Sequence, residues 1–289
     1  MREFWRLALE SARSFENDDG YAMSSHIALQ GLTAIFPFLI FVTSLGGFFG
    51  AQKMADDAAG AFFEIWPPQV SAPILNEIHQ VLSARHGGLV TISAVLAVYF
   101  SSSGVEALRT GLNRAYGLKE TRPWWRLRLQ SIGYVLIGAL ALLSLTFMLV
   151  LGPLIWAGVL KLAPALAPAS HLVALARYGV ATVILQIALI VAHWVLPNAR
   201  MRLRDCAPGI ILTFGAWMAF ALAFSAYLSR FAFNYVATYA GLASVMIAIV
   251  FLYALAAIFI YGAEVNEALA RARLARSQKK GREQPPAPK

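Results

Sequence analysis

The chain has 289 residues, of which 59% are hydrophobic and only 13% are charged, and its mean hydropathy is +0.62. Because soluble domains carry about 25% charged residues, this composition excludes a soluble globular protein and predicts an all-α polytopic membrane protein. The net charge of +9 indicates contact with anionic lipid headgroups and not with nucleic acid, because the basic residues lie beside the apolar segments.

Residues 1–23 are predicted to form an amphipathic helix at the cytoplasmic interface. Phe4, Leu7 and Phe15 recur at helical spacing, whereas three arginines fall largely on other faces. This pattern is typical of a helix that lies in the plane of the interface, and it also fits a helix packed on the loops of the bundle. The stretch NDDG then ends the helix.

Residues 24–265 are predicted to be a domain of six membrane spans. Crossing about 30 Å of hydrocarbon takes about 20 helical residues. Six apolar segments have this length, at 24–50, 88–108, 131–153, 172–195, 208–229 and 240–264. Pro37 lies inside the first and predicts a helix kink. The external connection 51–87 is predicted to carry an amphipathic helix.

The distribution of Lys and Arg predicts the orientation of these spans. With six crossings, 19 basic residues fall on the side of the N-terminus and five on the other side. The positive-inside rule therefore places both termini in the cytoplasm. Residues 266–289 form a basic cytoplasmic tail, whose end after Arg276 is predicted to be disordered because it is rich in Pro and Lys.

The second span carries a polar face. On a helix, residues three and four apart share a face, and polar side chains follow this spacing at Ser101, Ser102, Ser103, Glu106, Arg109 and Asn113. A carboxylate within the membrane is costly, so this face should be turned toward protein. It predicts either a seam that joins helices, with a Glu106–Arg109 ion pair, or the lining of a cavity open to the cytoplasm.

Glu264 and Asn266, at the end of the sixth span, lie at the same predicted depth as Glu106 and Arg109. These residues are candidates for a single polar cluster. His193, near the cytoplasmic end of the fourth span, is expected to be a hydrogen-bonded interfacial residue.

Four blocks in the sequence resemble the YihY/BrkB family of bacterial inner-membrane proteins. In order, they are GLTAIFPFLIFVTSLGGFFG, SSSGVEALRTGLNRAYG, LPNARMRLRDCAPGIILTFGAWMAF and YAGLASVMIAIVFLYALAAIFIYGAEVNEA. The resemblance runs over about residues 10–270 and implies a multi-pass protein of the bacterial inner membrane with six spans. It also implies a link to virulence and to the export of lipopolysaccharide precursors. Many members carry the label ribonuclease BN.

The residues themselves argue against that label. A metal-dependent nuclease needs clustered His and Asp ligands, whereas the five histidines here are scattered, without an HxH pair. The single cysteine, Cys206, excludes an intrachain disulfide. The sequence therefore predicts no catalytic residues, no metal and no cofactor, and it does not indicate an oligomeric state.

Three function classes remain. The first is a transporter or lipid-handling protein of the cell envelope, in which a lipid headgroup would meet Arg109, Arg114 and Arg122. The second is a scaffold that binds envelope protein partners without transport. An enzyme acting on lipids ranks last, because no nucleophile lies beside a base in any arrangement that the sequence indicates.

Overall fold

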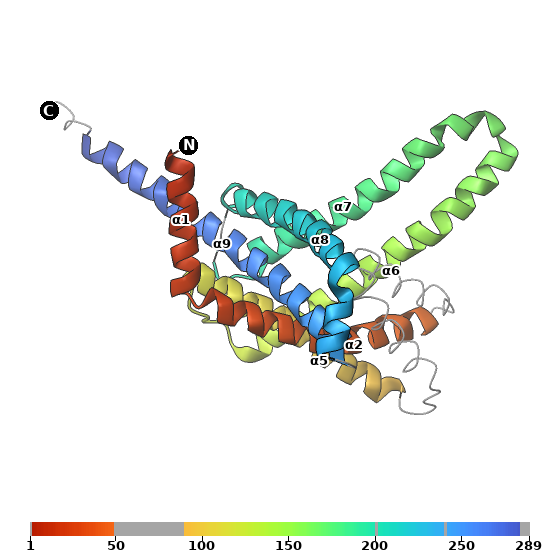
Figure 1. Ribbon diagram of the computed structural model, residues 1–289, viewed down its shortest axis with the longest axis horizontal. Coiled ribbons are helices and arrows are strands. Elements are labelled where there is room, and N and C mark those ends of the chain that lie inside the picture. The colour runs from red at the N-terminus through yellow and green to blue at the C-terminus, as the bar shows by residue number, and fades with distance from the viewer. Residues whose placement is uncertain (1, 49–89, 200–201, 240–241, 284–289) are drawn as a thin grey trace.

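The computed structural model describes residues 2–48, 90–199, 202–239 and 242–283 (Figure 1). The helices in chain order are α1 (Arg2–Asn17), α2 (Gly20–Phe48), α5 (Val90–Ala115), α6 (Trp124–Leu162), the 3-10 helix η1 (Pro164–Ala169), α7 (Ser170–Val195), α8 (Leu203–Tyr239) and α9 (Ala243–Glu283). The described residues contain no strand, so the all-α class is confirmed. The predicted external helix in 51–87 lies outside the described residues.

The described part of each predicted span lies within one helix, although the helix ends differ from the predicted ones. Three described segments are long and apolar enough to cross a membrane, at Trp124–Leu143, Leu203–Phe231 and Val245–Gln278, and a shorter apolar segment covers Thr182–Val195. The number of crossings and their orientation stay predictions. Pro37 lies inside α2, and its kink also stays a prediction.

The helix α9 continues to Glu283, past the point at which a disordered tail was predicted. Its last turns are rich in Ala, Leu, Arg, Gln and Lys, which are strong helix formers, although Ser277 and Gly281 favour the helix less. An ion pair at i, i+4 between Arg271 and Glu267 adds to the helix, with 2.8 Å between Nε and Oε1. Helix propensity therefore outweighs the polar composition of 277–283.

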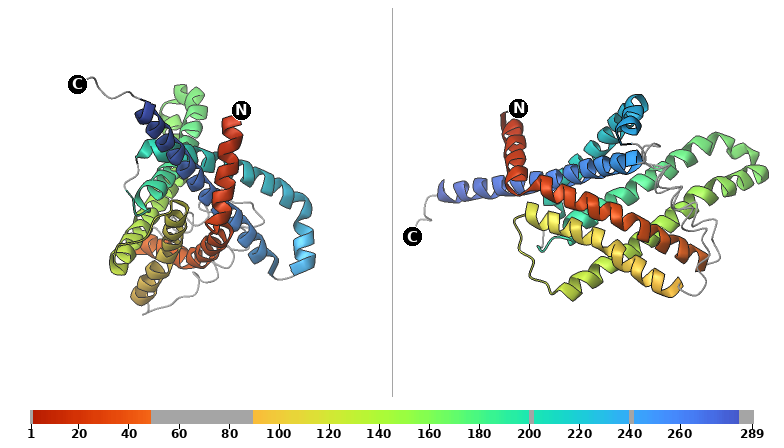
Figure 2. Two further views of the ribbon diagram at one scale, coloured as in Figure 1. Left: turned by 90° about the vertical axis from the view of Figure 1, so that its left-hand side faces the viewer. Right: turned by 60° about the horizontal axis from the view of Figure 1, so that its bottom comes forward.

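The buried core gathers at one end of the bundle. Most of its residues come from the C-terminal half of α5, the end of α7, the start of α8 and the middle of α9, and they include Leu112 and Ile260, both at most 1% exposed. α2 packs against α5 and α9, and the three helices run side by side (Figure 2). At the opposite end, the hairpin formed by α6, η1 and α7 extends away from the other helices (Figure 1).

The turn between α1 and α2 is fixed to the bundle by charge and by aromatic packing. Asp19 adopts a φ of 53°, a left-handed conformation that Asp tolerates better than most residues. Its carboxylate forms an ion pair with Arg114 of α5. Next to this turn, the ring of Phe15 is buried and meets the ring of Tyr21 edge-on at 5.0 Å. This corner directs α1 across α9.

The closest approach between helices is the crossing of α8 and α9. A Cβ atom on Gly209 would collide with the carbonyl oxygen of Gly262, and a Cβ atom on Gly262 would collide with the Thr213 hydroxyl. Small residues at this crossing let the two backbones touch, as is common between membrane helices. No side chain larger than hydrogen fits at either glycine unless the helices separate.

We expect Gly262→Ala to lower the free energy of unfolding by about 1–3 kcal/mol, the usual cost of overpacking a close contact. Gly215→Ala is the matched control, because a Cβ atom at that position of α8 has no atom within 4 Å. Thermal unfolding in nanodiscs would measure both. Equal melting temperatures for the two variants would contradict the assigned contact.

Candidate functional site

The three serines of α5 make different contacts. The hydroxyls of Ser101 and Ser102 donate back to their own helix, to the carbonyl oxygens of Ala97 and Tyr99, each at 2.6 Å. Bonds of this kind satisfy a hydroxyl inside a helix without any outside partner. Ser103 instead accepts a hydrogen bond from Nη1 of Arg128 at 3.4 Å. The serines are thus occupied by protein contacts.

Glu106 pairs with Arg128 of α6, and not with Arg109, the partner expected if the polar face were a seam between helices. The distance from Arg128 Nη1 to Glu106 Oε1 is 2.9 Å. Arg128 also donates to the carbonyl oxygen of Tyr99 at 2.7 Å, and its guanidinium lies 3.6 Å from the centroid of the Tyr99 ring. Glu106 binds Arg128 and not the nearby Arg109 because α6 places Arg128 against the same face of α5.

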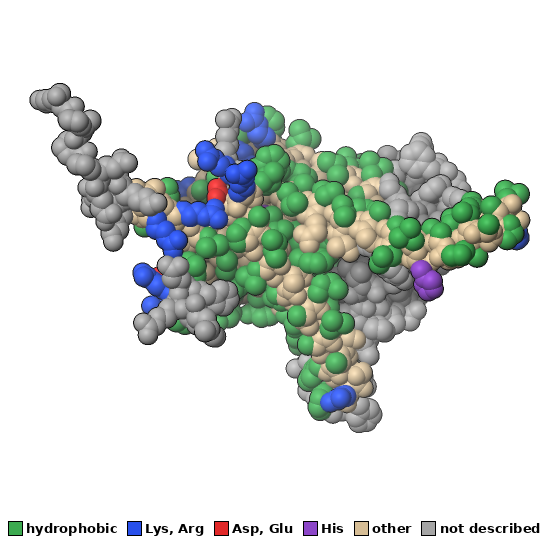
Figure 3. Space-filling view, turned by 90° about the horizontal axis from the view of Figure 1, so that it is seen from above, with side chains coloured by type: hydrophobic (Ala, Val, Ile, Leu, Met, Phe, Trp, Pro, Cys, Tyr) green, Lys and Arg blue, Asp and Glu red, His purple; other side chains and the backbone are tan. Residues whose placement is uncertain are grey.

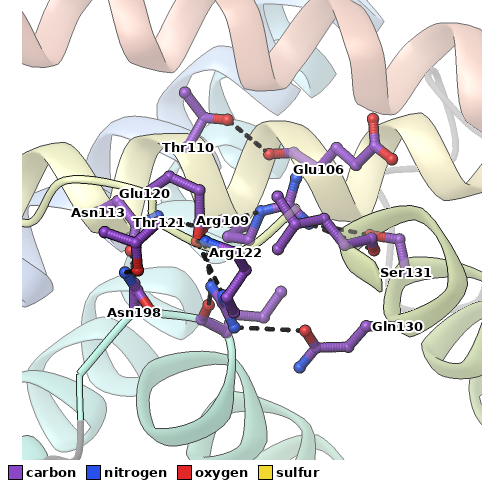
Figure 4. A network of polar contacts seen from close by, with 12 residues as sticks. Glu106, Arg109, Thr110, Asn113, Glu120, Thr121, Arg122, Gln130, Ser131 and Asn198 are labelled. Carbon is purple, nitrogen blue, oxygen red and sulfur yellow. Dashed lines mark hydrogen bonds and ion pairs between the residues drawn. The ribbon is translucent and has the colours of Figure 1, made fainter. Parts of the chain in front are cut away.

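Arg109 turns instead to Glu120, in the turn between α5 and α6. The Arg109 guanidinium is buried, 3.7 Å from the Glu120 carboxylate, and it also donates to the hydroxyl of Ser131 at 3.3 Å. Figure 4 shows Glu106 pointing away from this group. Arg109 therefore joins the C-terminal part of α5 to the start of α6.

The carboxylate of Glu120 is the centre of a larger network. Arg122 binds both of its oxygens, through Nε and Nη2, each at 2.8 Å. Asn113 donates to it from α5 at 3.0 Å, and Arg122 also donates to the carbonyl oxygen of Leu196 at 3.0 Å. Bidentate pairs of this kind are strong and geometrically specific. We call Arg109, Asn113, Glu120, Arg122 and Asn198 the Glu120 clamp.

Asn198 brings the segment after α7 into the clamp. Its backbone N–H donates to Oδ1 of Asn113 at 2.8 Å. Its side-chain amide donates to the carbonyl oxygen of Lys119 at 2.8 Å and to the hydroxyl of Thr121 at 2.9 Å. The clamp thus ties α5, α6 and the end of α7 together (Figure 4).

The electrostatics of the clamp favour the charged forms of Glu120 and Arg122. Hydrogen bonds from the Arg122 side chain lower the pKa of Glu120 from 4.5 to about 2, against the opposing effect of burial. The same bonds raise the pKa of Arg122. Burial lowers the pKa of Arg109, while Glu106 and Glu120 act in the opposite direction. The clamp is therefore a set of compensated charges at neutral pH.

Glu264 and Asn266 lie in a different contact, between α9 and its neighbours. Asn266 is fully buried; its Oδ1 accepts the backbone N–H of Gly209 at 2.6 Å, and its Nδ2 donates to the Tyr116 hydroxyl at 3.1 Å. Glu264 is 1% exposed, and neither carboxylate oxygen has a hydrogen-bond partner in the described part of the chain. The polar residues predicted as one cluster are thus divided among the clamp, the Glu106–Arg128 pair and α9.

His193 is also buried, at the end of α7. Its Nδ1 lies 3.0 Å from the carbonyl oxygen of Leu189, and its ring meets that of Phe259 edge-on at 4.6 Å. These contacts describe a histidine that packs α7 against α9.

A groove of about 520 Å³ separates α1 from the C-terminal part of α9. Its basic residues are Arg6, Arg271 and Arg276, and its small or apolar residues are Leu7, Ala268, Ala272 and Ala275. Glu10 and Ser14 complete the lining. The groove combines guanidinium groups with small and apolar side chains, as a site for an anionic amphiphile would.

Sequence reasoning missed Glu120, Arg128 and Asn198. A signal for Glu120 was present, because it is the only acid between Glu106 and Asp205, in a connection that carries many cations. Arg128 and Asn198 lie in later segments of the chain. Their contacts with α5 depend on how α6 and the end of α7 pack against it, which the sequence does not indicate.

The comparisons with known proteins cover nearly the whole chain. Residues 11–287 match the family described as virulence factor BrkB, so the resemblance stated above is confirmed. A ribonuclease-like protein, YfkH of Bacillus subtilis (strain 168), is 29% identical over 255 residues, which are 87% of this chain and 90% of that protein. No solved structure matches the chain at a significant level.

The name of this relative raises the question of a metal site. Within residues 2–48, 90–199, 202–239 and 242–283, no group of three or more His, Cys, Asp or Glu is placed to hold a metal ion. The described geometry therefore offers no support for metal-dependent RNA cleavage by these residues.

We expect Glu120→Gln to destabilise the protein by about 1–3 kcal/mol, because hydrogen bonds to charged groups contribute this much. The matched control is Glu10→Gln, which removes an exposed ion pair with Arg6 at 2.8 Å and should cost less than about 1 kcal/mol. Denaturation of both variants in the same detergent would test this. A Glu120→Gln effect no larger than that of the control would show that the clamp contributes no stability.

The lowered pKa of Glu120 gives this contribution a pH dependence. Because the pKa is about 2 in the folded protein and ordinarily 4.5, the contribution is fully present above pH 4.5 and is lost as the pH falls through 2. The difference in melting temperature between wild type and Glu120→Gln should therefore shrink on acidification. A constant difference from pH 7 down to pH 2 would refute the assignment.

Proposed function

This chain belongs to the virulence factor BrkB family, and on that premise we propose that it is a multi-pass protein of the bacterial inner membrane that transports or otherwise handles lipids of the cell envelope. The observation that carries this proposal is the groove between α1 and α9, which is lined by three arginines and by small or apolar side chains.

A six-span topology is the membrane arrangement that we propose. Three described helical segments are long and apolar enough to cross, and each of the other predicted spans coincides with a helix. Lys and Arg side chains gather at one end of the molecule, near α1 and the C-terminal part of α9, whereas the protruding hairpin is mostly hydrophobic (Figure 3). This asymmetry supports a cytoplasmic position for the basic end.

The headgroup site that we propose is the groove, and not the arginines named from the sequence. Arg109 and Arg122 are engaged by Glu120, and Arg114 is engaged by Asp19. The exposed guanidinium of Arg271 lies in the groove, with its Nε on Glu267. An anionic phosphate would add charge-assisted hydrogen bonds there, while an acyl chain would cover the alanines of α9.

One specific observation supports the scaffold hypothesis. The polar face of α5 is filled by contacts within the protein, in the Glu120 clamp and in the Glu106–Arg128 pair. This is what a packed bundle without a substrate path at that place would have. The two hypotheses differ in whether the reconstituted protein moves lipid.

Proteoliposomes of phosphatidylglycerol and phosphatidylethanolamine, with fluorescent phosphatidylglycerol as the probe, would test the proposal. We expect the wild-type protein to accelerate transbilayer movement of the probe. We expect Arg271→Gln to weaken phosphatidylglycerol binding about fivefold, since one arginine near a lipid surface contributes about 1 kcal/mol.

The control is Arg273→Gln, on the same helix. Arg273 is 53% exposed and Arg271 is 58% exposed, and each is in one ion pair, but Arg273 does not line the groove. Equal binding by the two variants would reject the groove as the headgroup site. Wild-type protein that binds lipid but leaves the movement of the probe unchanged would favour the scaffold.

A further inference from the structure

Glu264 differs from the other acids that the structure describes. Six of those acids are in ion pairs, at Glu10, Asp19, Glu106, Glu120, Asp205 and Glu267. Glu264 is 1% exposed, and neither of its oxygens has a hydrogen-bond partner among the described residues. An ionised carboxylate at this position would lose its hydration without gaining a hydrogen bond or an ion pair that compensates for the loss.

Glu264 lies on the face of α9 that α1 covers. One turn before it, the Tyr261 hydroxyl donates to the carbonyl oxygen of Ala8 in α1 at 3.2 Å. One turn after it, Ala268 lines the groove shared with α1. Residues three and four apart share a helix face, so Glu264 is placed between two contacts with α1. On α1, the Ser11 hydroxyl is also buried and unpartnered.

The charged groups around Glu264 do not neutralise a carboxylate. Asp18, in the turn between α1 and α2, and Glu267 of α9 both oppose a negative charge there. Arg271 favours it, but its Nε is 2.8 Å from Glu267. In the neighbouring elements, Arg6 of α1 is bound to Glu10, Arg114 of α5 is bound to Asp19, and Asp205 of α8 is bound to Arg273.

We propose that Glu264 is a proton-binding site, which holds a proton while α1 lies on α9 and releases it to cytoplasmic water when α1 lifts. Release leaves a carboxylate that water must solvate, so the charged form favours the lifted position. A metal ion is a poorer occupant, because one carboxylate and one hydroxyl do not supply the six or more oxygens that Ca²⁺ or Mg²⁺ takes.

Proton release at Glu264 would change the shape of the groove. The groove lies in the same seam between α1 and α9, one turn further along α9, so lifting α1 would change its width. That coupling rests on the proposed lipid-handling function, whereas proton binding at Glu264 does not.

The first measurement is infrared spectroscopy of the full chain in nanodiscs, which detects the C=O stretch of a protonated carboxyl. We expect Glu264→Gln to remove one such band at neutral pH. The control is Glu267→Gln, one turn away and paired with Arg271, which should keep the band. An unchanged spectrum in Glu264→Gln would overturn the proposal, and Glu264→Leu repeats the comparison if the first variant fails to fold.

The second measurement is the distance between α1 and α9. Spin labels at Leu9→Cys and Leu274→Cys, both exposed positions, in a Cys206→Ala background would report it across a pH series. In wild type and Glu267→Gln, the ratio of long to short distances should rise up to about tenfold per pH unit, as for release of one proton. Glu264→Gln should keep the short distance throughout.

A Glu264→Gln variant that titrates like the wild type would overturn the proposal. Neither measurement uses lipid movement as its readout. A failed lipid assay with a normal Glu264 titration would therefore reject the function and leave the proton site standing, and the reverse result would reject only the proton site.

Discussion

The architecture depends on one requirement, that the charges at the polar end of α5 be matched within the protein. Arg109 is buried and Glu120 is its counter-charge. Because Glu120 also binds Arg122 and Asn113, one carboxylate fixes three segments of the chain. Without it, a buried guanidinium would face a medium that cannot solvate it.

This requirement explains why the buried core lies at the end of the bundle that contains the clamp. The apolar core lies beside the clamp, formed by the parts of α5, α7, α8 and α9 that meet there. Away from it, large apolar side chains such as Leu172, Leu175 and Leu222 are about 70% exposed. In water such surfaces would be unfavourable, whereas acyl chains solvate them at little cost. Polar contacts and the α8–α9 glycine crossing thus hold together helices whose outer faces suit lipid.

The helices were predictable because hydrophobic length is a local property, and the structure places nearly all of the described part of each apolar segment in one helix. The partners of the polar residues were not, because they depend on tertiary packing. Glu106 had Arg109 one turn away in sequence but binds Arg128, which α6 brings from 22 residues further along the chain. The distinctive state of Glu264 is likewise invisible in the sequence, since an acid at the end of a span is ordinarily hydrated. Glu264 is buried without a hydrogen-bond partner among the described residues, whereas Glu267 is paired with Arg271.

The length of α6 decides where the tip of the hairpin would lie relative to a bilayer. α6 has 39 residues, and at 1.5 Å per residue it measures about 58 Å, nearly twice the thickness of the hydrocarbon layer, about 30 Å. Leu162, at its tip, is 90% exposed. The predicted span 131–153 covers only part of this length, so a crossing by α6 would carry its tip, with Lys161 beside Leu162, beyond the hydrocarbon layer. A cation at that tip would meet headgroups and water and not acyl chains.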